Sequence, residues 1–500
     1  MMACFLLLLW PFGAWATDPV SPPFIKFLGA ARMVSGSSYL VNTGSLRILI
    51  DCGSFMEGAG GGKSNRPDID PAGIDIIILT HAHADHAGHL PILHRQGFRG
   101  KVFATNATKA LLGITLEQSR KIMEEKGEYD YSREDIDGVL SRFTGLPYNK
   151  KIVLSPQVSL RFRDAGHILG SAMVELWIRD KTGPIKIVAT GDMGSGIIPL
   201  LPPPTIIEDG DYVLIESTYG PMKRSELNEK AFGEYIARTL AMGGSVLIPA
   251  FTLDRTQKVL YVLGNLKKAG IIPADTPVYG DSSSADAITR VYRRYGTYHA
   301  QYRKAEADPL SFPGFRQVRG AASLAAHDVG RPAVYVTSSG MLDHGQAPRH
   351  LSRMIGDERN LLAIVSWQAP GTIGAKLQQG VKTIAIPGDE PGGAELPPER
   401  SVKIRVKTFD IFSGHADGCG LLTWLAHFRR TKKVMVVHGE EKNALGLARI
   451  IRENLGFDAV APSLGETISL RAAADDHLRN AIISPCKGVT VSPGFSFPAD

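Results

Sequence analysis

In its first half, the 500-residue chain shows apolar positions at strand spacing, interrupted by segments at helical spacing. Short apolar runs that alternate with Gly, Ser and Asn turns predict an antiparallel meander at the start of the chain. Strands are expected at 24–28, 38–41, 46–50, 74–80, 152–154, 158–163, 172–178 and 185–190. Helices are expected, from the helical spacing, at 87–94, 106–126 and 133–143.

The pattern changes near residue 225, where helices and buried strands alternate regularly up to about residue 380. Such alternation is typical of βαβ units and predicts a parallel sheet covered by helices. The helices are expected at 225–242, 254–268, 285–295 and 346–354, and the strands at 245–248, 278–279, 333–336 and 361–365. After residue 401, strands are expected at 402–409 and 434–437, and helices at 418–427 and 444–455. The middle segment is therefore predicted to be a domain inserted into a split αββα domain.

The chain is expected to divide into five segments. They are an N-terminal extension (1–20), the first part of the αββα domain (21–220), the insert (221–402), the second part of the αββα domain (403–470) and a loosely packed tail (471–500). An apolar content of 44% over this length supports more than one hydrophobic core, because single cores stop growing at about 250–300 residues.

Charge and cysteine content narrow the chemistry only slightly. A formal net charge of +6 is mild for this length, so it permits a polyanionic partner without indicating one. The four cysteines, Cys4, Cys52, Cys419 and Cys486, lie far apart and form no C-x-x-C pair. This spacing argues against a thiolate zinc site or a dense disulfide framework. Any metal is therefore expected to be held by His and carboxylate ligands.

The first residues and one internal loop need separate interpretation. An apolar run at 5–10 and the triplet Ala14-Trp15-Ala16 resemble a signal peptide, but the segment is too short to span a bilayer. Because no Lys or Arg precedes the run, two interpretations stay open: a signal for export, or a start site assigned too far upstream of Val20. The Gly-rich loop at 58–62 lacks the spacing of a P-loop and is expected to be flexible.

Candidate chemistry is concentrated directly after the apolar run at 74–80. The sequence His81-Ala82-His83-Ala84-Asp85-His86 contains three imidazoles and a carboxylate. Clustered imidazoles are costly to bury without partners, whereas zinc binds neutral His nitrogen and carboxylate oxygen. We therefore predict a metal site at the C-terminal edge of a buried strand, rather than a polar loop formed by chance.

Four further titratable residues follow apolar runs and have glycine nearby: His167, Asp192, Glu216 and His438. Glycine lets the backbone turn tightly around a ligand, so each of the four is a candidate for the same site. Any one of them alone is more often a satisfied polar group or a turn residue. The prediction rests on the set.

In this order, the cluster at 81–86, His167, Asp192 and His438 resemble the metallo-β-lactamase fold, and Asp51 resembles the aspartate of its first motif. Glu216, His415 and His438 resemble three further motifs of the β-CASP nucleases, and the resemblance spans about residues 24–470. It implies an α/β fold, in which a metallo-β-lactamase αββα sandwich carries an inserted β-CASP domain made of a parallel sheet flanked by helices. Additional matches are Pro249-Ala250-Phe251, Arg255-Thr256-Gln257, Asp281-Ser282, Ser338 to Leu342 and Gly371 to Gly374.

The resemblance implies two zinc ions. One would be held by His81, His83 and His167 and the other by Asp85, His86 and His438, with Asp192 bridging both. Asp51 would accept an N–H from a ligand histidine and so fix its tautomer. Two metals on one phosphodiester suit in-line attack by a shared hydroxide.

The resemblance also implies a general acid. His415 would protonate the leaving alkoxide, and Glu216 would orient His415 and raise its pKa. The catalytic residues are thus expected to be His415, Glu216, Asp85 and Asp51. In the family, a histidine at the position of His438 accompanies cleavage of RNA, whereas members that act on DNA carry a different residue.

Substrate contacts are expected from the insert. Arg255, Ser338, Ser339 and Gly340 are candidates for binding backbone phosphates, because Arg forks match phosphate and glycine permits close approach. Each could instead be an ordinary surface or turn group. Asp343-His344 and Ala375-Lys376 depart from the family pattern, which leaves the path of the RNA open.

The predicted function is a zinc-dependent ribonuclease, acting inside the chain or from an end, with RNA as its partner and no membrane association. A homodimer is left open. The expected location is the cytoplasm, or outside it if residues 1–20 are a signal peptide. One alternative is a DNA nuclease or small-ester hydrolase on the same metal platform, although a small substrate would not need the insert. The other is an RNA-binding scaffold without activity, although such proteins lose ligands and none is lost here.

Overall fold

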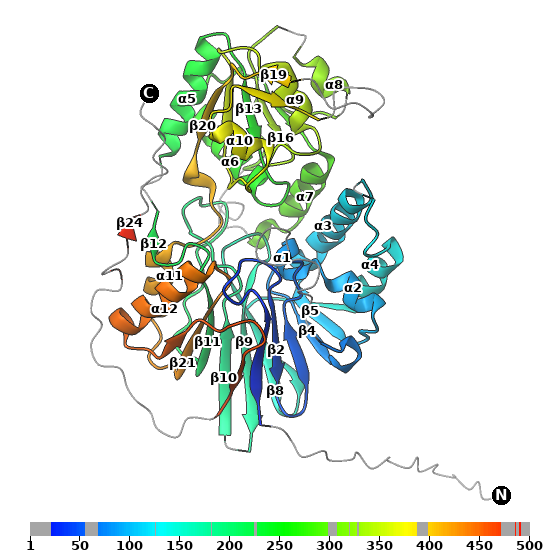
Figure 1. The fold of residues 1–500 in the computed structure, drawn as a ribbon, viewed down its shortest axis with the longest axis vertical. Coiled ribbons are helices and arrows are strands. Elements are labelled where there is room, and N and C mark those ends of the chain that lie inside the picture. The colour runs from blue at the N-terminus through cyan, green and yellow to red at the C-terminus, as the bar shows by residue number, and fades with distance from the viewer. Residues whose placement is uncertain are drawn as a thin grey trace, which may run out of the picture.

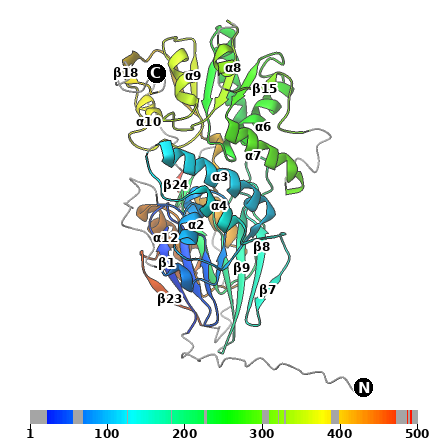
Figure 2. The same ribbon diagram turned by 90° about the vertical axis from the view of Figure 1, so that its right-hand side faces the viewer.

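A computed structural model describes residues 22–55, 69–125, 127–181, 183–224, 228–298, 308–319, 321–327, 330–387, 399–471, 486 and 490–491. In this part of the chain, two seven-stranded sheets form a sandwich and a six-stranded sheet forms a second body above it (Figure 1, Figure 2). The segment at 1–20, the Gly-rich loop at 58–62 and most of the tail expected at 471–500 lie outside the described residues.

The first sheet of the sandwich joins the N-terminal meander to a parallel extension. Its order is β23 (Thr467–Ser469), β1 (Phe24–Gly29), β2 (Ser38–Asn42), β3 (Arg47–Ile50), β4 (Ile76–Ile78), β5 (Lys101–Thr105) and β6 (Phe143–Leu146). The strands β1 to β3 pair antiparallel, as the turn pattern predicts, and β3 to β6 pair parallel. Ile76 and Ile78 pack between the two sheets, whereas Ile77 packs in the core on the outer face. The uninterrupted apolar run therefore forms a strand that is buried on both faces.

The second sheet of the sandwich brings several strand ends to one edge. Its order is β22 (Ala459–Val460), β21 (Lys433–Val437), β11 (Tyr212–Glu216), β10 (Gly183–Ala189), β9 (Ala172–Asp180), β8 (Val158–Asp164) and β7 (Ile152–Ser155). The strands β7 to β10 pair antiparallel, and β10, β11, β21 and β22 pair parallel. Parallel pairing places the C-terminal ends of β10, β11 and β21 at the same edge of the sheet.

Helices cover both outer faces of the sandwich. They are α1 (Ala84–Ala87), α2 (Leu90–Arg95), α3 (Asn106–Glu125) and α4 (Arg133–Leu140) on the first sheet, and α11 (Gly418–Leu425) and α12 (Glu441–Leu455) on the second. Leu112 of α3 belongs to the same core cluster as Ile77, and Leu421 and Ile451 of the other pair belong to the same cluster as Val213. The αββα sandwich implied by the family resemblance is confirmed.

The six-stranded sheet of the insert is parallel throughout. Its order is β15 (Phe315–Gln317), β14 (Val278–Asp281), β16 (Val334–Thr337), β13 (Val246–Pro249), β17 (Leu361–Ile364) and β20 (Arg405–Thr408). Val246 and Ile248 belong to one core cluster and Leu247 to another, so helices bury both faces of the sheet. Those helices are α5 (Glu229–Ala241), α6 (Arg255–Lys268), α7 (Ser283–Arg294), α9 (Ala347–Met354) and α10 (Ile373–Gln378). The short helix α8 (Ala321–Ala325) lies beside α9, where the Leu324 carbonyl accepts from Arg353. The predicted parallel sheet is confirmed.

Short elements complete the described structure. They are the 3-10 helices Pro71–Gly73, Gly296–Tyr298 and Asp410–Phe412, the antiparallel pair β18 (Thr383–Ala385) and β19 (Glu399–Ser401), and the parallel pair β12 (Met222–Lys223) and β24 (Thr490–Val491).

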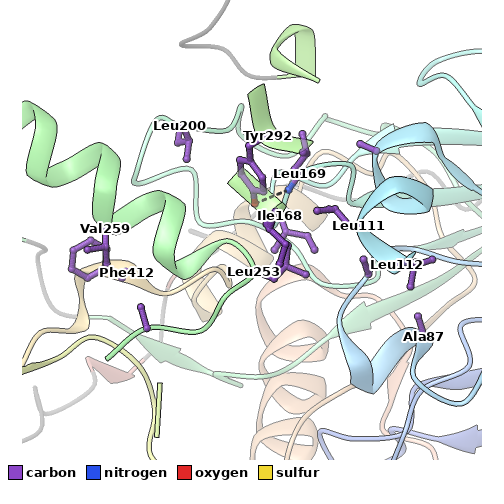
Figure 3. Close-up of a cluster of buried hydrophobic side chains, with 14 of the residues drawn as sticks. Ala87, Leu111, Leu112, Ile168, Leu169, Leu200, Leu253, Val259, Tyr292 and Phe412 are labelled. Carbon is purple, nitrogen blue, oxygen red and sulfur yellow. Dashed lines mark hydrogen bonds between the residues drawn. The ribbon is translucent and has the colours of Figure 1, made fainter. Parts of the chain in front are cut away.

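One hydrophobic core runs from the sandwich into the insert. Figure 3 shows Leu112 of α3 and Ile168, beside the predicted ligand His167, in the same cluster as Val259 of α6. The backbone N–H of Leu169 donates to the hydroxyl of Tyr292 on α7 over 3.3 Å. The insert is therefore packed directly against the segment that carries His167.

Some elements differ from the sequence prediction. The helix expected at 87–94 is two short helices, and Pro91 lies in the first turn of the second, a position that needs no N–H donor. Phe143 begins β6 rather than ending a helix, and β5 was not predicted. The strand expected at 402–409 pairs with β17, so the sheet of the insert extends past residue 402. The domain boundaries themselves stay a prediction.

Candidate active site

The predicted ligands gather where strands of both sheets end. Asp51 follows β3, and the cluster beginning at His81 follows β4, its parallel neighbour. In the second sheet, Asp192 lies three residues beyond β10, Glu216 ends β11, and His438 follows β21. Gly191 has a φ of 53°, and a Cβ there would lie 2.6 Å from the Thr80 Cβ, so only glycine allows this turn beside the first sheet.

Four ligand atoms form the first set. Nδ1 of His83 lies 3.1 Å from Nε2 of His81 and 3.2 Å from Nε2 of His167. Oδ2 of Asp192 lies 3.5 Å from each of those two Nε2 atoms. The four atoms lie within 4.8 Å of one another, which is compatible with one tetrahedrally bound metal ion.

A second set adjoins the first. Nε2 of His438 lies 3.1 Å from Nε2 of His86 and 3.3 Å from Oδ2 of Asp85. The other carboxylate oxygen of Asp192, Oδ1, lies 3.2 Å from Nε2 of His86. The two oxygens of Asp192 thus face the two sets separately, which is the arrangement that a bridging carboxylate requires.

Burial and charge suit these residues to bind cations. Burial lowers the pKa of His81, His83 and His167, which keeps their imidazoles neutral with lone pairs available. Burial opposes the ionised form of Asp192, but the surrounding histidines outweigh it and hold the pKa of that carboxyl well below its usual value. Its buried Oδ1 accepts no hydrogen bond from the described residues, so this oxygen has capacity for a metal ion.

Carboxylate and histidine charges also shift the second set. For Asp85, burial raises the pKa, but His86 and His438 lower it to about 2. For His86, burial lowers the pKa, but Asp192, Asp51 and Asp85 together raise it well above the usual value. A proton and a metal ion therefore compete for His86.

Hydrogen bonds from surrounding residues orient the ligand rings. Nδ1 of His86 donates to Oδ2 of Asp51 over 2.8 Å, and Asp51 also accepts from the backbone N–H and the hydroxyl of Thr80. Nδ1 of His167 donates to the carbonyl of Gly414 over 3.0 Å. With Nδ1 protonated, each ring turns the lone pair of Nε2 toward the site. Asp51 lies where the predicted orienting role requires it, although the role itself stays a prediction.

The buried Glu216 and the half-buried His415 form a pair next to the ligands. Nδ1 of His415 lies 3.1 Å from Oε2 of Glu216, which also accepts from the hydroxyl of Thr218 over 2.6 Å. Oε1 of Glu216 accepts from the backbone N–H of Met193 over 2.5 Å. Burial lowers the pKa of His415, but Glu216 and then Asp192 outweigh it, so that the pKa is raised. The pair is thus arranged to keep His415 protonated.

The candidate substrate residues of the insert are engaged in internal contacts. Arg255 is half-buried and donates from Nη1 to the carbonyl of Val365. Ser338 donates to the Ser282 hydroxyl over 3.0 Å, and the Ser339 hydroxyl accepts from the backbone N–H of Asp343 over 3.2 Å. These contacts shape the ends of β13, β16 and β17, and phosphate binding by these residues stays a prediction.

Several supporting residues were not singled out from the sequence. Lys258 of α6 donates from Nζ to the carbonyl of His167 over 3.3 Å and pairs with Asp254 at 2.5 Å. The spacing of four residues between Asp254 and Lys258 is a helical ion-pair signal that could have indicated this pair. Nothing local in the sequence indicates that Thr218 contacts Glu216.

One disulfide joins the start of α11 to a residue near the end of the described chain. Cys419 of α11 is bonded to Cys486, 67 residues later in the chain, and Cys52 is buried and free. The sequence argued only against a dense framework, and a single long-range bridge leaves no spacing signal.

Known families match most of the chain. Residues 31–112 match the metallo-beta-lactamase superfamily, residues 256–377 match the Beta-Casp domain, and residues 399–462 match the Zn-dependent metallo-hydrolase RNA specificity domain. The last match covers the end of the insert and the segment with His415 and His438.

Individual relatives cover nearly the whole chain. Ribonuclease TTHA0252 of Thermus thermophilus is 36% identical over 431 residues, which are 85% of this chain and 94% of the relative. Transcription termination factor FttA of Pyrococcus abyssi is 34% identical over 473 residues, covering 89% of this chain and 71% of the relative. The RNase J-like protein of Methanocaldococcus jannaschii is 29% identical, covering 89% of this chain and 99% of the relative.

A solved structure supports the fold. The crystal structure of a protein of unknown function from Enterococcus faecalis aligns with a TM-score of 0.55 at 13% identity, covering 90% of this chain and 100% of that chain. This chain belongs to the β-CASP family of metallo-β-lactamase-fold hydrolases, and the predicted resemblance is confirmed. No helix within the described residues combines the length and the apolar character that a membrane crossing needs.

Proposed function

We propose that this protein is a metal-dependent ribonuclease that hydrolyses RNA phosphodiester bonds. The observation that carries the proposal is the pair of ligand sets that share Asp192, with the Glu216–His415 pair beside them. A small-ester hydrolase would need the ligands but not a protonated histidine held by a buried carboxylate. The named relatives that are ribonucleases and the matched RNA specificity domain support RNA as the substrate.

The residues that would hold two zinc ions are His81, His83 and His167 for one, and Asp85, His86 and His438 for the other, with Asp192 shared. Imidazole nitrogens with one carboxylate oxygen in the first set and two in the second are donors that suit zinc. When bound, such ions act as Lewis acids that polarise a phosphate and increase the acidity of water. The number and identity of the metals are part of the proposal.

The chain itself would supply the proton for the leaving group. A 3′-alkoxide leaves poorly unless it is protonated, and His415 carries a proton because Glu216 accepts from its Nδ1. The second ring nitrogen, Nε2, is then the atom that transfers its proton to the leaving oxygen. Asp51 acts on His86 by fixing its tautomer. The expected products carry 5′-phosphate and 3′-hydroxyl ends.

A direct assay tests this proposal. The purified protein is incubated with RNA labelled at either end, single-stranded DNA and a thioester, each with and without a chelator. We expect consumption of RNA only, loss with the chelator, and two zinc ions per chain by elemental analysis. Consumption of DNA or the thioester would instead favour another hydrolase, and RNA binding without metal or cleavage would favour a scaffold. The two labels distinguish internal from terminal cleavage.

A matched pair of variants ties the activity to the site. His415→Ala should lose most cleavage and keep its metal, whereas His427→Ala should retain activity because His427 is an exposed histidine whose ring donates to carbonyls of α11. Equal activity of the two variants would remove His415 from the mechanism. We also propose a cytoplasmic location and a homodimer, which fractionation of the tagged native protein and sedimentation would test.

A further inference from the structure

Two aromatic side chains are exposed at the edge of the insert sheet. Among the exposed large hydrophobic residues, Trp367 is 64% exposed and Phe251 is 38% exposed. Phe251 lies two residues after β13 and Trp367 three residues after β17, and these strands are parallel neighbours in the sheet. Both side chains therefore come from the same C-terminal edge, where the residues predicted to contact substrate also lie.

The loop that carries Trp367 is fixed by buried hydrogen bonds. Its two neighbours, Ser366 and Gln368, are buried. Nε2 of Gln368 donates to the carbonyl of Gly340 over 2.9 Å and to that of Ser366 over 3.0 Å. A tryptophan held outward by a rigid loop pays little conformational entropy when a flat ligand covers it.

The loop that carries Phe251 touches the same glycine. The carbonyl of Phe251 accepts from the N–H and the hydroxyl of Thr256, at 3.1 and 2.8 Å. A Cβ on Gly340 would lie 3.0 Å from the Phe251 nitrogen and 3.2 Å from its ring, so glycine permits this close packing. Gly340 therefore joins the two aromatic loops into one patch, which we call the aromatic edge (Phe251, Gly340 and Trp367).

The aromatic edge is connected to the metal ligands through α6. Arg255, in the first turn of α6, donates to the carbonyl of Val365, two residues before Trp367. Lys258, one turn further along the helix, donates to the carbonyl of His167. Thr252, next to Phe251, donates to the side chain of Gln118 on α3 over 3.0 Å. The patch thus has a fixed position relative to the reaction site.

We propose that Trp367 and Phe251 stack against unpaired nucleobases of the RNA strand whose phosphate is cleaved. The proposal rests on the proposed ribonuclease function and adds two side chains that position its substrate. A strand that carries flat bases beside its phosphates matches a hydrolytic site flanked by exposed aromatic faces. Stacking tolerates any base, and bases within a duplex have no free face to offer. The bases that Trp367 and Phe251 contact are therefore expected to be unpaired.

Steady-state kinetics of the holoenzyme on single-stranded RNA test the role of Trp367. Trp367→Ala should raise KM about 5- to 150-fold, the range set by base–aromatic stacking of about 1–3 kcal/mol, with little change in kcat. Trp367→Phe should recover most of the loss because it restores an aromatic face. Tyr129→Ala is the control, since Tyr129 is 72% exposed but lies in the loop between α3 and α4.

A series of RNA substrates with a single abasic site at successive positions identifies the stacked base. Wild type should bind the RNA more weakly when the abasic site is at one or two positions next to the cleaved bond. At those positions, Trp367→Ala should bind abasic RNA and intact RNA equally well. An unchanged KM for Trp367→Ala would overturn stacking, and so would independent effects of the variant and the abasic site at every position. Neither result would contradict the proposed ribonuclease function. A change from dimer to monomer with unchanged KM would instead assign the patch to a second copy of the chain. Wild type that cleaves no RNA would overturn the proposed function and the stacking site together.

Discussion

Replacing Glu216 with Gln tests the proposed proton donor most directly. Glu216 is fully buried and accepts from three donors: His415 Nδ1, Thr218 Oγ1 and the Met193 N–H. Glutamine has a single acceptor oxygen, so at least one of these donors would face an NH2 group. The charge that favours the protonated form of His415 is lost as well.

The expected size of the effect follows from this geometry. A hydrogen bond to a charged group contributes about 1.5–3 kcal/mol, which corresponds to about 10- to 150-fold in kcat/KM. The sign of the pH effect is fixed: a general acid must be protonated, so activity falls as pH rises through the pKa of His415. Because Glu216 helps to raise that pKa, Glu216→Gln should move the alkaline limb of the profile to lower pH. Bound metal ions shift the pKa of His415 in the wild type and in Glu216→Gln alike, so the difference between the two pH profiles reports the contribution of Glu216.

The assay combines kcat/KM against pH with metal analysis of the same preparations. Glu216→Gln should keep its full metal content, although Glu216, Asp192 and His438 also lie close enough to hold an ion. The double variant with His415→Ala should be no less active than His415→Ala alone, because Glu216 acts through His415. Metal loss, an unmoved alkaline limb, or a further loss in the double variant would refute the reasoning.

Three more outcomes are expected. Asp51→Asn should weaken metal binding about 10- to 100-fold while leaving the fold intact, measured by competition with a chelating dye, because Asp51 fixes the ring of His86; unchanged affinity would contradict this. Acidification should release the metal, because the pKa of His86 is raised and protons compete with the metal ion for this ligand. Dialysis at each pH and elemental analysis of the protein would measure the release, and full metal retention at low pH would contradict this prediction. Tyr292→Phe should lower the free energy of unfolding by about 1–3 kcal/mol and reduce activity, because the Tyr292 hydroxyl accepts from the Leu169 N–H and donates to Asp254. Tyr131→Phe, which loses one bond to a carbonyl, should cost stability but not activity.

Local sequence rules succeeded where one interaction dominates. The three isoleucines of β4 are apolar on both faces of the strand, so a buried strand could be predicted from this local run alone. Local rules failed where two structures compete over a few residues, as at Phe143, which pairs with Val102 of β5 instead of extending a helix. The strand at 405–408 is another case, since only pairing with β17 assigns it to the insert.

The sequence by itself determined the kind of chemistry, because ligand type is a property of side chains: the cluster at 81–86 has metal-binding groups in any fold. Only the tertiary structure decided how those groups are shared. Asp192 turns one oxygen to each ligand set because strands of both sheets end at a common edge. Glu216 reaches His415, 199 residues away, where the chain returns from β20 of the insert to α11 of the sandwich. The exposure of Trp367 was equally invisible in the sequence, since an aromatic residue after a buried strand is ordinarily expected in a core. Distances across a sheet edge depend on strand order, and strand order is fixed only when the whole chain packs.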